Sequence, residues 1–534
     1  MTVLAGAASA GVGAGGIARR ETRGLPVERL TPVVIAAVVL AIAIVTITPW
    51  PVGTFQDDAV YVVLAKALAT GEGYRMINMP GAPHATHFPP GYPLFLAILW
   101  KLFPTFPDNV VVFKFANAVL LAVAAVGTYR FSRDRAELGL VGAAVAALLG
   151  TVSIVVILVT GVVLSEPMFM ALLLPTLIVT ERVVDDGGMR RAIVAGLLIG
   201  ALAMVRTVGV LVLPAALLAL VVRGRWRAAV VLGVAAAIVI APWQLWISAY
   251  QGEIPAPFVG KYGAYGQWLV QGYREGGFAL ASAVLAKNAN ELFGFFGFAT
   301  LPVNLPIPRL VSLAAVVALV SLGAWRARHR VSTTAAFIVT YIAIILVWPF
   351  EPTRFALVLW PLLVPLFVLG MRTVVEWRPA LTAAQALRAV ALVSTLVVSA
   401  GYGWYNIWGY RDRWWATMQR DLGGRATPVA EWVASATMSG DVLVTDHDLV
   451  VYLYSGRQAV PTVTFHPRSH VAPLTPEEDT EMLRTILSFY RPRFYVATTP
   501  YTVGMAKRLA AESPPRLRFV RDTRSAVIYE PVSQ

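Results

Sequence analysis

Two adjacent carboxylates, Asp57 and Asp58, follow an apolar run that ends near Trp50. Further along, residues 87–93 read His-Phe-Pro-Pro-Gly-Tyr-Pro, a rigid turn that leads back into apolar sequence. A carboxylate can accept the proton of an attacking hydroxyl group when it lies within hydrogen-bond reach of that group. An acidic pair just outside a membrane span therefore indicates chemistry at the membrane surface rather than conduction through the membrane.

The acidic pair opens a segment, residues 59–70, that is expected to form a short helix ending at Gly71. One aspartate could serve only as the helix N-cap, a position that favours this residue type. Adjacent helical side chains do not face each other, so Asp57 and Asp58 are not expected to act as a facing pair. In the chemical interpretation Asp57 faces a cavity as a base and Asp58 caps or supports it. Spacing alone leaves both interpretations open.

The composition determines the class of protein that positions these groups. The chain has 534 residues, 57% of them hydrophobic and 14% charged, with a mean hydropathy of +0.67. Soluble domains carry about 25% charged residues, so this is a polytopic α-helical membrane protein. The absence of cysteine excludes thiol chemistry and disulfides. The net charge of +14 is spread between apolar segments, which indicates topology and anionic lipid contact rather than nucleic-acid binding.

The apolar runs predict about eleven transmembrane helices. Residues 1–29 are expected to form a disordered cytoplasmic tail, and residues 31–50 to form a first span that is retained because no cleavage site follows it. Further spans are expected at residues 110–129, 138–158, 164–178, 192–205, 208–222, 228–247, 310–325, 335–348, 355–370 and 388–405.

Arginine clusters lie between these spans, near residues 130–135, 182–191, 223–227, 326–330 and 372–378. Basic loops favour the cytoplasmic side, and with the N-terminus inside every cluster falls there. This assignment requires a hairpin turning at residues 206–207 and a re-entrant or interfacial segment at 278–305. It leaves three pieces outside: the loops 51–109 and 248–309, and a C-terminal domain at 410–534 after a transmembrane domain at 30–409.

The C-terminal domain is expected to be a small α/β module. Its strands are expected at residues 441–446, 493–498 and 525–530, and its helices at 476–490 and 501–511.

Five motifs together resemble one family of membrane enzymes. They are residues 57–61 (DDAVY), 88–94 (FPPGYPL), 164–169 (LSEPMF), 241–243 (APW) and 354–361 (RFALVLWP). Over roughly residues 30–405 the chain resembles the GT-C membrane glycosyltransferases, in the branch of the protein O-mannosyltransferases and lipid A aminoarabinose transferases. The resemblance implies an inverting transfer of sugar from a polyprenyl-phosphate carrier to an acceptor hydroxyl on the outer face.

The resemblance also assigns roles to residues. It implies that Asp57 is the general base, with Asp58 and Glu166 as further acids of the site. It implies a substrate loop formed by Tyr61, Pro89, Pro90 and Tyr92. The family often has a lysine before the Pro-Pro pair; this chain has Phe88 there and His87 one residue earlier.

Cations are expected near the leaving phosphate, where negative charge develops. Arg206 and Arg354 lie at outer ends of spans, against the positive-inside trend, and carry a fork of donors suited to phosphate. The alternatives are snorkelling or an ion pair between Glu351 and Arg354. His87 and Lys261 are further candidates to bind the carrier phosphate.

A carboxylate inside lipid costs ~2.5–3.5 kcal/mol at a helix centre and less near an end, so Glu166 is expected to face a cavity or a partner, the alternative being solvation by headgroup water. The family resemblance implies a site role for Glu166, as second acid or metal contact. No ligand set has the spacing of a metal site, so the sequence implies no certain cofactor and leaves a divalent metal open. Residues 446–448 (Asp-His-Asp) are interpreted as a turn at a strand end rather than a metal site.

Two other classes of function remain open. A secondary transporter would place charges near the bilayer midplane and often show inverted repeats. A non-catalytic envelope protein that binds a lipid-linked sugar would make no demand on Asp57. For the transferase, the expected partners are the carrier, a glycan, lipid or protein acceptor and membrane lipids, at a bacterial plasma membrane. The sequence names neither the sugar nor the acceptor.

Overall fold

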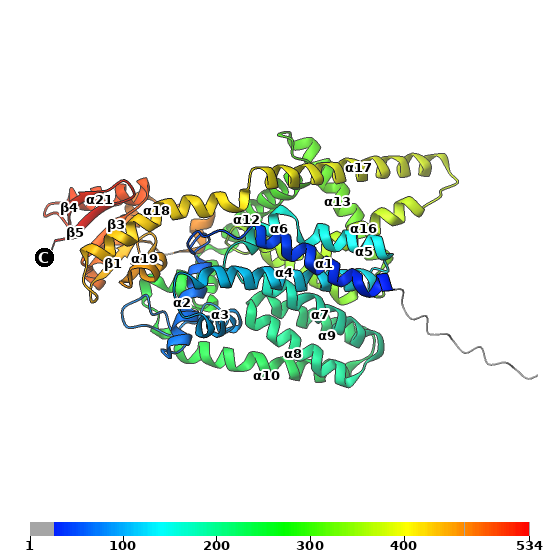
Figure 1. The fold of residues 1–534 in the computed structure, drawn as a ribbon, viewed down its shortest axis with the longest axis horizontal. Coiled ribbons are helices and arrows are strands. Elements are labelled where there is room, and N and C mark those ends of the chain that lie inside the picture. Colours follow the sequence, from blue (N-terminus) through cyan, green and yellow to red (C-terminus); the bar gives the residue numbers. More distant parts are fainter. Residues whose placement is uncertain (1–25, 464, 533–534) are drawn as a thin grey trace, which may run out of the picture.

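A computed structural model of the chain describes residues 26–463 and 465–532. Long helices lie side by side in a bundle, and a small five-stranded sheet domain covers one end of it (Figure 1). The tail expected at residues 1–29 falls largely outside the described residues, and the first helix already begins at Pro26.

The helices of the bundle and its loops are α1 (Pro26–Val45), α2 (Asp57–Thr70), α3 (Gly91–Leu102), α4 (Asn109–Asp134), α5 (Leu140–Thr151), α6 (Ile154–Thr160), α7 (Glu166–Asp186), α8 (Met189–Val205), η1 (Thr207–Leu211), α9 (Val212–Val222), α10 (Trp226–Tyr250), η2 (Gln251–Glu253), η3 (Ala256–Phe258), α11 (Val259–Tyr262), α12 (Tyr265–Thr300), α13 (Pro306–Arg326), α14 (Ser332–Leu346), α15 (Pro352–Ala356), η4 (Leu357–Leu359), α16 (Trp360–Glu376) and α17 (Thr382–Arg411). The remaining elements are α18 (Trp414–Ala436), β1 (Val442–Thr445), α19 (Asp448–Ser455), β2 (Gln458–Pro461), η5 (Pro467–His470), α20 (Pro476–Tyr490), β3 (Phe494–Ala497), α21 (Pro500–Ala510), β4 (Leu517–Asp522) and β5 (Val527–Pro531).

Every expected span corresponds to a helix or a pair of helices. Among the described residues, seven helices are long and apolar enough to cross a membrane, or eight if α5 and α6, bent by 54°, form one span. Shorter apolar helices add to these at α3, at η1 with α9, and at α14. The expectation of a polytopic helical protein with a small C-terminal α/β domain is confirmed at this level.

The chain reverses direction at Arg206, as the hairpin requires. Arg206 is extended between α8 and η1. A side chain at Gly209 would place its Cβ 2.7 Å from the carbonyl oxygen of Leu202, so only glycine lets η1 pack on the end of α8. Consequently α9 returns to the end of the bundle from which α8 started.

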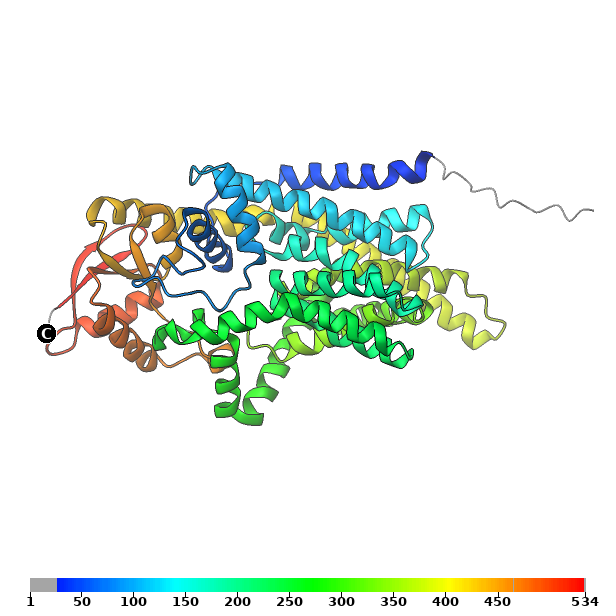
Figure 2. The same cartoon turned by 90° about the horizontal axis from the view of Figure 1, so that it is seen from below.

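The segment expected to be re-entrant or interfacial lies mostly in α12. Two helical arms meet in it at Gly277, whose φ of 56° breaks the helix. In Figure 2 the arms form a V (green) that projects sideways from the bundle. Its placement at a membrane surface stays a prediction.

The five arginine clusters meet at the end of the bundle away from the sheet domain. Arg135 pairs with Asp185 at 2.5 Å, and the Arg223 side chain donates to the carbonyl oxygen of His329 at 3.2 Å. Arg372 donates to the carbonyl oxygen of Glu137 at 3.1 Å. This is the arrangement that alternating basic loops require, whereas the side of the membrane that this end faces stays a prediction.

The C-terminal sheet has the strand order β2-β1-β3-β5-β4, with β2, β1 and β3 parallel and β5 antiparallel to both β3 and β4. The three predicted strands are β1, β3 and β5. Two edge strands were missed: β2 has four residues and ends in a proline, and β4 is mostly exposed, so neither has a clear hydrophobic pattern.

Candidate functional site

The loop before α2 is held so that Asp57 and Asp58 take different tasks. The Asp58 carboxylate accepts hydrogen bonds from the backbone amides of Gly53 at 2.6 Å, Thr54 at 3.1 Å and Phe55 at 3.0 Å. Burial raises the pKa of Asp58, while these three bonds act in the opposite direction. The Asp58 carboxylate is therefore bound within its own loop, whereas Asp57 makes contacts outside that loop.

Lys114 of α4 binds the start of the same loop through its side chain. Its buried Nζ atom donates to the carbonyl oxygens of Thr48 and Trp50 and to Oε1 of Gln419, each at 2.9 Å. Sequence reasoning missed Lys114, although a single lysine inside an apolar span is a usable signal. Because Gln419 belongs to α18, the helix that leads into the sheet domain also contributes to the position of this loop.

Four of the predicted site residues come together in an alternating chain of charges. Arg354 pairs with Asp57 on one side, and its Nε atom lies 3.4 Å from Oε1 of Glu166. Nη1 of Arg206 lies 2.8 Å from the same Glu166 oxygen. Asp57 begins α2, Glu166 begins α7, Arg206 follows α8 and Arg354 lies in α15, so four distant segments build this cluster.

Glu166 is the most enclosed member, at 0% exposure. Among the described residues neither of its oxygens has a partner with hydrogen-bond geometry, so its contacts with the two guanidinium groups are ion pairs. A buried carboxylate is tolerated when it is paired. Arg354 was considered a possible partner of Glu351; its ion-pair partners are Asp57 and Glu166 instead.

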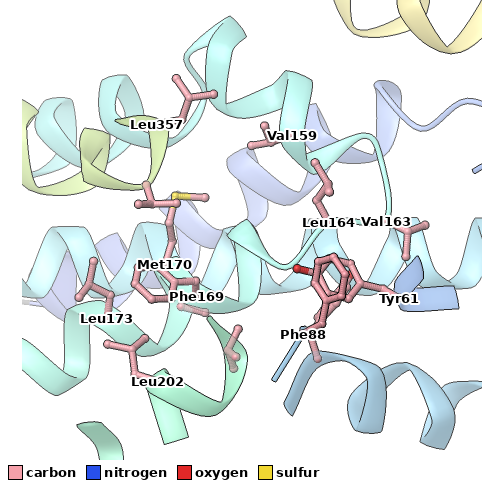
Figure 3. Close-up of a cluster of buried hydrophobic side chains, with 14 of the residues drawn as sticks. Tyr61, Phe88, Val159, Val163, Leu164, Phe169, Met170, Leu173, Leu202 and Leu357 are labelled. Carbon is pink, nitrogen blue, oxygen red and sulfur yellow. The ribbon is translucent and has the colours of Figure 1, made fainter. Parts of the chain in front are cut away.

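Aromatic rings frame the two arginines. The Arg354 guanidinium lies 5.5 Å from the ring centre of Phe55 and 5.2 Å from that of Phe355, and the Arg206 guanidinium lies 5.5 Å from the ring centre of Phe355. Cation–π contacts of this kind attract the guanidinium to the ring and help to orient it. Figure 3 shows the buried apolar packing of this region, with Tyr61 and Phe88 side by side near Leu164.

Two tyrosines of the predicted substrate loop are linked by hydrogen bonds to the segment that precedes Glu166. Tyr61 donates to or accepts from Oγ of Ser165 at 3.1 Å, next to Glu166. Tyr92 is fully buried, and its hydroxyl donates to Asn117 at 3.0 Å, which in turn donates to the carbonyl oxygen of Leu164 at 3.0 Å. Both tyrosines therefore hold the segment that presents Glu166.

The Pro-Pro-Gly turn packs next to the segment that carries Arg206. Pro89 is buried, Pro90 is half-buried, and the next residue begins α3. A Cβ at Gly91 would lie 2.6 Å from the carbonyl oxygen of Met204, so the turn packs against the end of α8, two residues before Arg206.

His87 lies beside the charged chain and is 8% exposed. Its Nδ1 atom lies 2.8 Å from the carbonyl oxygen of Gly263 and donates to it, which leaves Nε2 for another partner. Burial lowers the pKa of His87, and the nearby charge of Asp57 partly opposes this. The ring centre of Tyr265 lies 4.4 Å from the imidazole.

Lys261 makes its ion pair elsewhere, with Asp448 of the sheet domain at 3.1 Å. His84 is bound to Glu253 at 2.7 Å. The predicted role of Lys261 at the carrier phosphate stays a prediction.

No group of three or more His, Asp and Glu side chains that could hold a metal ion is found among the described residues. In the Asp-His-Asp turn the two carboxylates diverge: Asp446 binds Thr498 and Thr502, whereas Asp448 binds Lys261 and Tyr262. The interpretation of this segment as a turn therefore agrees with the geometry.

No protein-family model and no curated protein matches the sequence. The crystal structure of ArnT from Cupriavidus metallidurans bound to undecaprenyl phosphate superposes with a TM-score of 0.57 and 12% identity, covering 95% of this chain and 99% of ArnT. The chain has the fold of ArnT.

The apo structure of ArnT gives the same result, with a TM-score of 0.54 and 13% identity over 94% of this chain and 97% of ArnT. ArnT is a lipid A aminoarabinose transferase of GT-C type, so the GT-C expectation is confirmed for the fold. At this identity the likeness to ArnT concerns the fold alone.

Proposed function

We propose that this protein is a GT-C-type glycosyltransferase that moves a sugar from a polyprenyl-phosphate carrier to an acceptor hydroxyl on the outer face of the membrane. The observation that carries the proposal is the alternating chain of charges Asp57–Arg354–Glu166–Arg206, in which Glu166 and Arg206 are buried and Asp57 and Arg354 are half-buried. It lies in a chain with the fold of ArnT, a protein crystallised with undecaprenyl phosphate. Residues 30–409 would form the catalytic domain and residues 410–534 an extracytoplasmic domain of a bacterial plasma-membrane protein.

The two arginines supply what a lipid phosphate needs. A guanidinium binds phosphate oxygens through two parallel N–H donors. Arg354 can turn from Asp57 to the carrier phosphate while it keeps Glu166 as its second partner. Arg206 stays fixed by Glu166 and by the hydroxyl of Ser165, to which it donates at 3.1 Å.

The same exchange activates the base. While Asp57 is paired with Arg354, the guanidinium occupies its carboxylate oxygen. Once Arg354 binds phosphate, the carboxylate can accept a hydrogen bond from the acceptor hydroxyl and take its proton. The acceptor oxygen then attacks the anomeric carbon, and its proton passes to Asp57. The bond from the anomeric carbon to the phosphate oxygen breaks, and its electron pair stays on the phosphate beside Arg354 and Arg206. Attack opposite the leaving group inverts the configuration.

The other residues position these groups. Asp58 and Lys114 fix the loop that carries Asp57, and Tyr61 orients the segment before Glu166. Glu166 holds both arginines at one place, and its free lone pairs can also accept from a hydroxyl of the sugar. His87 can present Nε2 to the carrier phosphate, because its Nδ1 is already committed to Gly263.

The test compares wild type with Asp57→Asn in membranes supplied with a panel of radiolabelled polyprenyl-phosphate sugars. Removal of a general base is expected to slow transfer by ~100- to 10,000-fold. Asp134→Asn is the matched control, because Asp134 also pairs with an arginine, Arg182 at 2.9 Å, at the opposite end of the bundle. Transfer by wild type and the control but not by Asp57→Asn supports the proposal. Equal transfer by all three refutes Asp57 as the base, and no transfer from any donor by folded wild type refutes the function.

A further inference from the structure

Asp448 joins the sheet domain to both outer loops of the helical part. It follows β1 closely, at the start of α19, and is 1% exposed. Its carboxylate accepts a hydrogen bond from the Tyr262 hydroxyl at 2.6 Å and pairs with Nζ of Lys261 at 3.1 Å. Nδ2 of Asn78, from the first outer loop, lies 3.5 Å away. Three segments that are distant in sequence therefore meet at one buried carboxylate.

The position of Asp448 in the sheet is informative. In open parallel sheets, ligands bind outside the carboxyl ends of the strands, where the strand order reverses. The order β2-β1-β3 places such a reversal at β1, the strand that Asp448 follows. Here the side chains at this edge bind Lys261 and Tyr262 of the protein's own second outer loop. Asn78 adds a second contact with the sheet domain: its backbone carbonyl oxygen accepts a hydrogen bond from the backbone amide of Ala459 in β2 at 2.8 Å.

The contact between Asp448 and Tyr262 lies only one residue along the chain from the hydrogen bond that holds His87. Tyr262 ends α11, and the next residue, Gly263, provides the carbonyl oxygen to which His87 donates at 2.8 Å. A Cβ at Gly263 would lie 2.6 Å from the carbonyl oxygen of Val259, so only glycine fits at this turn. Tyr265, whose ring faces His87, begins the following helix. A displacement of Tyr262 is therefore expected to displace the carbonyl group of Gly263 and, with it, the imidazole of His87.

We propose that Asp448 is a positioning residue for the transfer reaction: through Lys261 and Tyr262 the sheet domain fixes the loop that orients His87 and Tyr265 at the edge of the charged site. The reaction itself rests on the proposed function, whereas the fixing of the loop can be tested without it. The sheet domain is then part of the catalytic unit rather than an appended module.

The first test uses Asp448→Asn, which keeps the shape of the side chain and removes its charge. Because a misplacement of ~1 Å can cost ~100-fold, the KM for the carrier is expected to rise by about 10-fold or more, with a smaller change in kcat. Asp448→Glu, which keeps the charge, should recover most of the loss. Asp446→Asn is the matched control: among the residues that the structure describes, Asp446 accepts hydrogen bonds only from Thr498 and Thr502 of the sheet domain, at 2.7–2.9 Å. It should lower the thermal midpoint and leave the carrier KM unchanged.

The second test reads the loop directly, by hydrogen exchange of residues 259–263 in the full-length protein. The amide of Gly263 donates to the carbonyl oxygen of Val259 at 2.9 Å and should exchange faster in Asp448→Asn but not in Asp446→Asn. Tyr262→Phe, which removes only the 2.6 Å bond, should show the same effect if Asp448→Asn fails to fold. Unchanged exchange in these variants overturns the proposal, as does faster exchange with unchanged transfer kinetics. If wild type transfers no sugar, the proposed function fails and hydrogen exchange alone decides the positioning role.

Discussion

Replacing Glu166 by glutamine isolates the role of the central charge, because it keeps the size of the side chain and removes its charge. Glu166 is fully buried and pairs with Arg206 at 2.8 Å and Arg354 at 3.4 Å. In the variant Arg354 keeps Asp57 as a counter-ion. Among the described residues Arg206 then has the Ser165 hydroxyl, the face of Phe355 and the neutral amide of the new side chain, so it becomes a buried cation without an anionic partner.

The expected cost follows from this asymmetry. Removing one partner of a buried ion pair costs ~3–5 kcal/mol, and since Arg354 retains Asp57 we expect the lower end, ~3 kcal/mol. A phosphate bound between the arginines would replace the missing charge. A ligand at ~100 times its Kd contributes ~2.7 kcal/mol to stability. The same phosphate concentration should therefore stabilise Glu166→Gln more than wild type, because the variant gains a counter-ion that wild type already has.

The assay is thermal unfolding of the detergent-solubilised protein, followed by tryptophan fluorescence, with and without undecaprenyl phosphate. Glu181→Gln is the control, because Glu181 lies on the same helix, is equally buried, and accepts hydrogen bonds from the amide and hydroxyl of Thr334 at 2.8 and 2.9 Å. It should lower the midpoint without enlarging the ligand-induced shift. The reasoning is refuted if Glu166→Gln is as stable as wild type, or if the ligand shifts all three proteins equally.

Two further predictions concern charge at the same site. Burial lowers the pKa of His87 below 6.5, so between that lowered value and 6.5 the unfolded state binds the proton first and stability falls as the pH falls. Denaturant unfolding from pH 7.5 to 5 should show this slope in wild type and a flatter one in His87→Gln; identical slopes would contradict it. Arg354→Lys keeps the charge and loses the planar fork, so the carrier KM should rise by about 10-fold, the equivalent of ~1.4 kcal/mol. The carrier dependence of initial transfer rates measures this, and an unchanged KM would exclude a forked contact with phosphate.

The fold was predictable because hydropathy and arginine placement are properties of single segments. Apolar length identified the spans, and the alternation of basic loops required the reversal at Arg206, which the structure contains. Strands β2 and β4 were not predictable in this way. A four-residue strand such as β2 is specified by its neighbours in the sheet, and the pairing of Val444 with Val460 joins segments that local patterns do not connect.

The candidate site was predictable by residue type but not by partner. Asp57, Glu166, Arg206 and Arg354 stood out because each is a charge where the local sequence is apolar. The division of tasks between Asp57 and Asp58 depended on the backbone of Gly53 to Phe55, whose amides point at Asp58 only after the loop has folded. The contacts of Lys261 and Lys114 likewise cross more than sixty residues of sequence, so no local pattern could show them.

The charge balance of the site bears on the direction of the proposed reaction. The two arginines and two carboxylates of the alternating chain sum to zero charge. This neutrality explains why Arg206 and Arg354 can lie at the end of the bundle opposite the other arginine clusters. A carrier phosphodiester brings one negative charge into this neutral site. The product of transfer is a phosphate monoester with a charge of about −1.5 to −2 at pH 7, and Asp57 regains its own negative charge when it releases the proton. Since that carboxylate would then compete for Arg354, re-forming the Asp57–Arg354 pair would help to expel the product, and each turnover of the proposed reaction would return the site to the ion pair seen in the structure.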